Sequence, residues 1–340
     1  MDIKIYGTDT SGHQLVKSLI SELLLKAEIP FNISEVNDVS KFLAKGIDSI
    51  PAIQMNSQPI VGLKSNGSFR KALRAAVNEI LASQNYGALA KVIIPVNFSE
   101  AAINALSFGH RLATDLKAVT KILHVHNPHA QPKNGLTPLC YEGSKTKLKQ
   151  LADTMDRDWG SDILKASFVS SELKVGIPTS TIAESIANDK ATLVIMGTPT
   201  EYTINMRSLI IIEVIKVAKS SVMIVPQHVH YKGIHRVALF LDDDMINSDE
   251  LEYLTTFLAP FNATIHLVSS ATRGLKSDFP KITLPQVAQE STICACRNPA
   301  DGLNQYAADN QIDLVVLLSR NSLAIRYPFS QSNTPVLILK

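Results

Sequence analysis

The sequence predicts an α/β protein made of one small domain and two doubly wound parallel sheets. Short apolar runs alternate along the chain with segments whose apolar residues recur at helical spacing. Most of these runs are continuously apolar, as expected of strands in a parallel sheet covered on both faces. A series of strands that begins near residue 91 begins again near residue 237. The 340 residues therefore suggest three domains, at 1–85, 90–228 and 233–340.

The first domain has predicted elements in the order βαβα and then ββα. Its first strand alternates and is rich in isoleucine, and Gly46 marks the end of a short helix. Pro59 suits a fourth strand that lies at an edge. Residues 83–87 have the composition of a linker. The expected strands are 2–6, 31–33, 50–55 and 59–62, and the expected helices are 15–24, 39–43 and 69–81.

The second domain alternates strictly between strand and helix, which favours a doubly wound parallel sheet. Its first strand is continuously apolar, and Ser99 and Glu100 open the following helix. Three prolines and Gly135 predict a loop at 127–141. The expected strands are 92–96, 120–125, 166–170, 193–196 and 222–225, and the expected helices are 98–113, 144–159, 178–188 and 211–218.

The third domain repeats the second in a shortened form. Four apolar runs follow in the same order, and residues are missing between the second strand and the fourth. The repeated strands are 237–242, 264–268, 314–317 and 336–339.

Composition excludes several classes of function. Lys plus Arg total 33 and Asp plus Glu total 31, so the chain lacks the basic excess of nucleic-acid and membrane-surface proteins. No window approaches the roughly 18 apolar residues of a membrane span, and the start lacks the pattern of a signal peptide. The three cysteines, Cys140, Cys294 and Cys296, form no disulfide framework and no zinc-binding pattern. We expect a cytoplasmic protein that contacts neither nucleic acid nor membrane.

Residues from 91 onward resemble the universal stress protein family. The resemblance rests on "PVNFSEAAINALSFGHRLA" after the first strand, on "AESIANDKATLVIMGT" around the fourth, and on the closing "SSVMIVP". The third domain is a weaker copy. Tandem members of this family pack their two copies as an internal pseudo-dimer, and the resemblance implies that arrangement here. Because edge strands need cover, the closing strands at 222–225 and 336–339 are expected to contact each other.

The resemblance also implies where a nucleotide would bind. Nucleotide-binding members hold ATP phosphates with Gly-x2-Gly-x9-Gly-Ser/Thr after the fourth strand, where backbone N–H groups approach the phosphates. Here only Gly197 matches, and the later positions hold Thr200, Ile210 (or Leu209) and Ile211. Branched side chains would block the phosphates. The implied site, degenerate in this way, comprises Pro95, Asn97, Val125, Gly197, Thr198 and Asp242.

Residues 1–82 resemble thioredoxin- and glutaredoxin-like domains through "IKIYGTDTSGHQ" and "GIDSIPAI". Thr10 and His13, or Ser11 and Gln14 in a shifted alignment, stand where the redox cysteines belong. Hydroxyl groups cannot perform thiol–disulfide exchange, so this domain is expected to be redox-inactive. The resemblance implies a cis peptide before Pro51. A partner-docking surface would then comprise Thr10, His13 and Pro51.

Other polar clusters favour ordinary structural roles. His124 and His126 point to one face of a strand without a third ligand, and Asp242 with its two following aspartates suits a strand-end turn better than a metal site. Arg207 is the one nearby charge that would meet a phosphate, but a solvated loop arginine is the simpler interpretation.

The sequence therefore predicts a non-catalytic, stress-associated binding or adaptor protein without a metal or obligatory cofactor. Its expected partner is a protein or a second copy of the chain. The alternative is a weak adenine-nucleotide sensor that binds through the second domain. A thiol-dependent redox enzyme is a third class, which the missing cysteines disfavour.

Overall fold

The computed structural model describes residues 2–8, 11–26, 31–47, 49–55, 61–62, 91–129, 140–158, 169–199, 206–241, 246–270, 290–294, 299–321, 323–327 and 332–340. The chain forms two compact units, and each is described by itself. One comprises residues 1–89 and 158–168, and the other comprises residues 90–157 and 169–340. In the described part of the chain, no helix has both the length and the hydropathy needed to cross a membrane.

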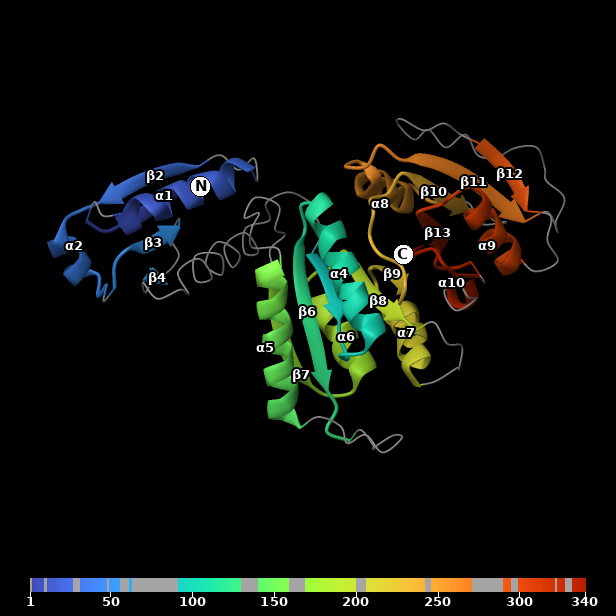
Figure 1. Ribbon diagram of the computed structural model, residues 1–340, viewed down its shortest axis with the longest axis horizontal. Helices are drawn as coiled ribbons and strands as arrows, with labels where there is room; N and C mark the ends of the chain where they lie inside the picture. The colour runs from blue at the N-terminus through green and yellow to red at the C-terminus, as the bar shows by residue number, and fades with distance from the viewer. Residues whose placement is uncertain are drawn as a thin grey trace. The chain divides into compact units, whose positions relative to one another are not determined.

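The first unit contains a mixed sheet with the strand order β2-β1-β3-β4. Strand β1 pairs with β2 in parallel and with β3 in antiparallel orientation, and β3 pairs with β4 in antiparallel orientation. The Ile50–Pro51 peptide is cis, as predicted. The helix expected at 69–81 and residue Thr10 lie outside the described residues. The elements are β1 (Asp2–Tyr6), α1 (Ser11–Lys26), β2 (Asn32–Val36), α2 (Val39–Ala44), β3 (Ala52–Met55) and β4 (Val61–Gly62) (Figure 1).

The second unit begins with strand–helix alternation, as predicted. Strand β5 lies between β8 and β6, in the middle of the first five strands. Its Val92, Ile93 and Ile94 are fully buried because helices cover both faces of the sheet. The strands are β5 (Lys91–Pro95), β6 (Val119–His126), β7 (Val169–Val175), β8 (Leu193–Thr198) and β9 (Ser221–Pro226). The helices are α4 (Glu100–Asp115), α5 (Tyr141–Asp158), α6 (Pro178–Asn188) and α7 (Met206–Val217).

The remaining residues of this unit add strands to the same sheet. Helix α8 starts at a capping box, in which Asn247 and Glu250 each accept the other's backbone N–H. The strands are β10 (Arg236–Phe240), β11 (Thr264–Ser270), β12 (Glu290–Cys294), β13 (Leu314–Leu318) and β14 (Val336–Leu339). The helices are α8 (Ser248–Leu258), α9 (Pro299–Asp309) and α10 (Leu323–Arg326).

The described strands of this unit form a ten-stranded sheet in the order β12-β11-β10-β13-β14-β9-β8-β5-β6-β7. Read inward from either edge, each half has its third, second, first, fourth and fifth strands in that order. Every pairing within a half is parallel. The two halves meet where β14 pairs with β9 in antiparallel orientation, with Leu337 opposite Met223. The predicted contact between the closing strands is therefore confirmed.

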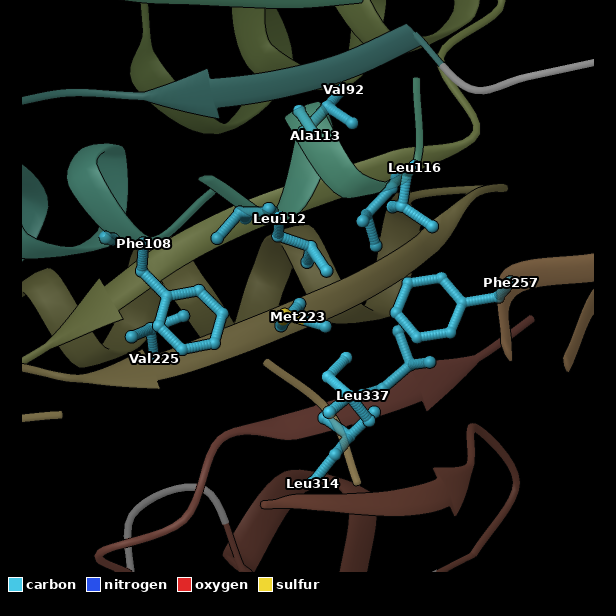
Figure 2. Close-up of a cluster of buried hydrophobic side chains, with 14 of the residues drawn as sticks. Val92, Phe108, Leu112, Ala113, Leu116, Met223, Val225, Phe257, Leu314 and Leu337 are labelled. Carbon is cyan, nitrogen blue, oxygen red and sulfur yellow. The ribbon is translucent and has the colours of Figure 1, made fainter. Parts of the chain in front are cut away.

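The hydrophobic core on one face of the sheet runs across this junction. Phe108 and Leu112 of α4 lie near Met223 of β9, and Leu337 of β14 and Phe257 of α8 complete the same cluster (Figure 2). A second core on the opposite face joins α6 and α7 to α9 and α10 in the same way. Both cores are shared between the halves, so burial of apolar surface holds the two halves together.

The chain between β9 and β10 is fixed to α4. The Asn104 side-chain amide donates to the carbonyl oxygens of Pro226 at 3.1 Å and Val229 at 2.8 Å. The Tyr231 hydroxyl donates to Asp115, and the Tyr231 ring packs edge-on against Phe108. Specific contacts thus hold residues 226–231 of the connection against α4.

Candidate functional site

A cleft of about 440 Å³ opens at the carboxyl ends of β5 and β8. Parallel sheets place their ligand sites at this edge, where successive connections leave in opposite directions. Helices α4, α6 and α7 also contribute to the walls. The lining residues are Pro95, Val96, Asn97, Phe98, Ser99, Glu100, Ala101, Ala102, Leu123, Val125, Pro178, Ile182, Met196, Gly197, Pro199, Ile210, Ile211 and Gln227.

The turn between β5 and α4 uses its own polar groups internally. The Asn97 side-chain oxygen accepts from the Ser99 backbone N–H at 3.1 Å and from the Ser99 hydroxyl at 2.6 Å. The Ser99 hydroxyl in turn caps α4 by accepting from the Ala102 N–H at 3.3 Å. Two backbone N–H groups of this turn are therefore already paired within it.

Glu100 and Gln227 form the polar rim of the cleft. The Gln227 side-chain amide donates to the Glu100 carboxylate at 2.7 Å, and the Gln227 backbone N–H donates to the Thr198 carbonyl oxygen at 2.9 Å. Glu100 is the one charged side chain among the described residues that line the cleft. The charge at the described rim is therefore negative, which opposes the approach of an anion.

Gly197 is required by packing. A Cβ atom at this position would lie 2.0 Å from the carbonyl oxygen of Ala101 and 2.4 Å from its carbonyl carbon. The end of β8 thus touches the backbone of the first turn of α4 directly. This close approach explains the glycine without any ligand.

Isoleucines line the wall where the phosphate-binding motif would place glycine and a hydroxyl. Ile210 and Ile211 lie in α7, and Ile211 is 4% exposed. Both isoleucines therefore face the cleft at the carboxyl ends of β5 and β8. Thr200 and the Arg207 side chain lie outside the described residues.

Four of the six residues predicted for a nucleotide site line the cleft: Pro95, Asn97, Val125 and Gly197. Thr198 is buried and is not among the described residues that line the cleft. Asp242 lies outside the described residues.

Sequence reasoning missed most of the apolar wall and both rim residues. Leu123 lies two residues before Val125 on the same face of β6 and was predictable from strand alternation. Ile182 and Gln227 come from separate elements, and only the folded chain brings them to the cleft.

The two histidines of β6 have local partners. His124 donates from Nδ1 to the Val96 carbonyl oxygen at 2.7 Å, and its ring packs against the Phe98 ring, tilted by 40° with the ring centroids 4.4 Å apart. Burial lowers the pKa of His124, the bond to Val96 opposes that shift, and His126 adds to it. His126 Nδ1 lies 3.4 Å from the Ser144 hydroxyl. Among the described residues, no three His, Cys, Asp or Glu side chains gather as a metal site would require.

The corresponding edge of the second half contains an ion pair. Arg320, which follows β13, donates to both carboxylate oxygens of Glu250 in the first turn of α8. Glu250 is 2% exposed, so the pair is largely shielded on the carboxylate side. Leu318, which stands where the first half has Gly197, is fully buried.

The first unit does not expose His13, contrary to the prediction of a docking surface. His13 is fully buried, and its Nε2 lies 3.2 Å from the Glu35 carboxylate. Lys17 also binds Glu35, and these two partners lower the pKa of the Glu35 carboxyl, Lys17 contributing most. Pro51 is partly exposed. The pairing of His13 with Glu35 was missed because His13 lies in α1 and Glu35 in β2, and only the fold brings the two together.

Comparison with solved structures places the fold. A universal stress protein from Archaeoglobus fulgidus DSM 4304 is similar with a TM-score of 0.52 and 14% identity, over 74% of this chain and 96% of that one. A functionally unknown protein from Pseudomonas aeruginosa PAO1 has a TM-score of 0.45 and 14% identity, over 74% of this chain and 93% of that one. No curated protein matches the sequence. Residues 89–226 match the profile of the Universal stress protein family, so this part of the chain is a domain of that family.

Proposed function

We propose that this protein is a non-catalytic, stress-associated binding protein of the cytoplasm. In this proposal a redox-inactive thioredoxin-like domain precedes two universal stress protein repeats, and the repeats form an internal pseudo-dimer. The family match over residues 89–226 supports the stress-associated role. The recurrence of one strand order on both sides of the β14–β9 junction supports the tandem arrangement.

The observation that carries the proposal is the wall of the cleft. Isoleucines occupy the positions where phosphates need glycine and a hydroxyl, and the Glu100 carboxylate stands at the rim. Gly197, the one remaining motif residue, is explained by its contact with Ala101. The protein is therefore proposed not to bind ATP in the manner of nucleotide-binding relatives.

Calorimetry with ATP and Mg²⁺ on the full chain tests this proposal. We expect no measurable heat of binding at micromolar protein. A dissociation constant in the low micromolar range, worth about 8 kcal/mol, would contradict it. That result would favour a nucleotide sensor, a second candidate supported by the presence of Asn97 and Gly197 at the carboxyl edge of the sheet.

The absence of catalysis in the first unit rests on chemistry. Thiol–disulfide exchange needs a thiolate, and the three cysteines all lie beyond residue 139. Cys140 is exposed directly before α5 in the other unit. An insulin-reduction assay should show no turnover. Turnover that survives replacement of Cys140, Cys294 and Cys296 would refute this part of the proposal.

The proposed partner is a protein or a second copy of this chain. The formal net charge of +2 gives no support to a nucleic-acid partner. Analytical ultracentrifugation over a range of concentrations separates self-association from a monomer that needs a different protein.

A further inference from the structure

We propose that the cleft at the carboxyl ends of β5 and β8 binds a neutral, largely apolar small molecule. The inference rests on the proposed function, because it takes the cleft to be a binding site without a phosphate. The walls, the size and the charge of the cleft indicate the chemical class of its ligand.

The floor and walls are apolar. Leu123 is fully buried, Ile182 is 4% exposed and Met196 is 6% exposed, and all three line the cleft. Val125 and Ile210 are partly buried at the same walls. The volume of about 440 Å³ falls within the range of small-molecule sites, roughly 300–1,000 Å³. A ligand with an apolar body fits this lining.

The polar groups at the rim select against anions. Glu100 is the one charged side chain of the described lining, and the Asn97 oxygen is already used by Ser99. Gln227 donates to Glu100, so one hydrogen bond to the rim carboxylate is already made within the protein. A neutral donor on the ligand, such as a hydroxyl or an amide N–H, suits this rim, whereas the Glu100 carboxylate disfavours a phosphate, sulfonate or carboxylate.

Fluorescence titration with N-phenyl-1-naphthylamine, a neutral apolar probe, tests the inference. The probe should bind saturably to the full chain at one site. Val125→Trp fills the cleft and should weaken binding at least tenfold. The matched control is Val175→Trp, because Val175 is 56% exposed and does not line the cleft. The control should change the affinity less than twofold. If Val125→Trp fails to fold, Ile210→Asp provides the same readout from a different wall.

The anionic analogue 1-anilino-8-naphthalenesulfonate tests the charge argument. Glu100→Gln should raise the affinity for the sulfonate relative to the neutral probe at least threefold. The matched control is Glu184→Gln, which removes an exposed carboxylate on α6 outside the cleft. This variant should leave the ratio of the two affinities unchanged.

The outcomes separate this inference from the proposed function. Absence of saturable binding of the neutral probe, or binding that a folded Val125→Trp variant retains in full, overturns the inference alone. Tighter binding of the sulfonate than of the neutral probe by the unaltered protein also overturns it. Micromolar binding of ATP that displaces the probe overturns the proposed function as well.

Discussion

Replacing Gly197 by alanine tests directly why a glycine stands at the end of β8. The added Cβ would lie 2.0 Å from the Ala101 oxygen and 2.4 Å from its carbon. Carbon and oxygen normally approach to about 3.3 Å, so the first turn of α4 must move away from β8. Overpacking of this kind costs about 1–3 kcal/mol. Because the contact is with backbone and not with a flexible side chain, we expect a loss of about 3 kcal/mol.

Urea unfolding of the full chain, followed by circular dichroism, measures this loss. The matched control is Gly109→Ala in α4, where the new Cβ meets only the side-chain ends of Ile94 and Ile195 at 2.7 and 2.8 Å. Alanine also gains about 1 kcal/mol of helix propensity there, so the control should remain within about 1 kcal/mol of the unaltered protein. A Gly197→Ala variant of unaltered stability would refute the packing explanation and return Gly197 to a ligand-binding role.

Three further predictions concern stability. Burial, assisted by Arg111, lowers the pKa of His110 from 6.5 to about 4, so between these pH values the unfolded chain binds a proton that the folded chain excludes. Acidification from pH 7 to pH 4.5 should therefore lower the free energy of unfolding, measured with urea, by about 2–3 kcal/mol more in the unaltered protein than in His110→Gln. Arg320→Met leaves the Glu250 carboxylate, which is 2% exposed, without its cation, and should lower the free energy of unfolding by about 2–3 kcal/mol, less than for a fully buried pair because Arg320 is partly exposed. Adding Glu250→Gln to that variant should restore part of the lost stability, whereas additive losses from the two changes would contradict the pairing. Ser99→Ala removes the cap of α4 and should cost about 1 kcal/mol in thermal unfolding, whereas Ser99→Asn should retain most of the stability.

Elements with continuous apolar runs were predictable from the sequence. Strand β8 at Leu193–Thr198 and strand β9 at Ser221–Pro226 follow such runs, and the structure confirms both within two residues. Strand β7 was expected at 166–170 but is described at Val169–Val175. Its sequence, VSSELKV, carries polar side chains because it lies at the edge of the described sheet, so the apolar signal was weak.

The site was predictable only in its local parts. Asn97 and Gly197 follow their strands directly, so their place at the carboxyl edge follows from the topology. The reason for Gly197 was not predictable, because it depends on how closely α4 approaches β8. The pairing of Arg320 with Glu250 joins residues 70 positions apart. No local periodicity encodes a contact of that separation.

Native mass spectrometry of the full chain, as purified from its cells, tests the central claim that this is a binding protein without a nucleotide. We expect that no adenine nucleotide is retained, and that any retained small molecule is uncharged and extractable into an organic solvent. A stoichiometric adenine nucleotide on the folded chain would show that the cleft is a nucleotide site after all.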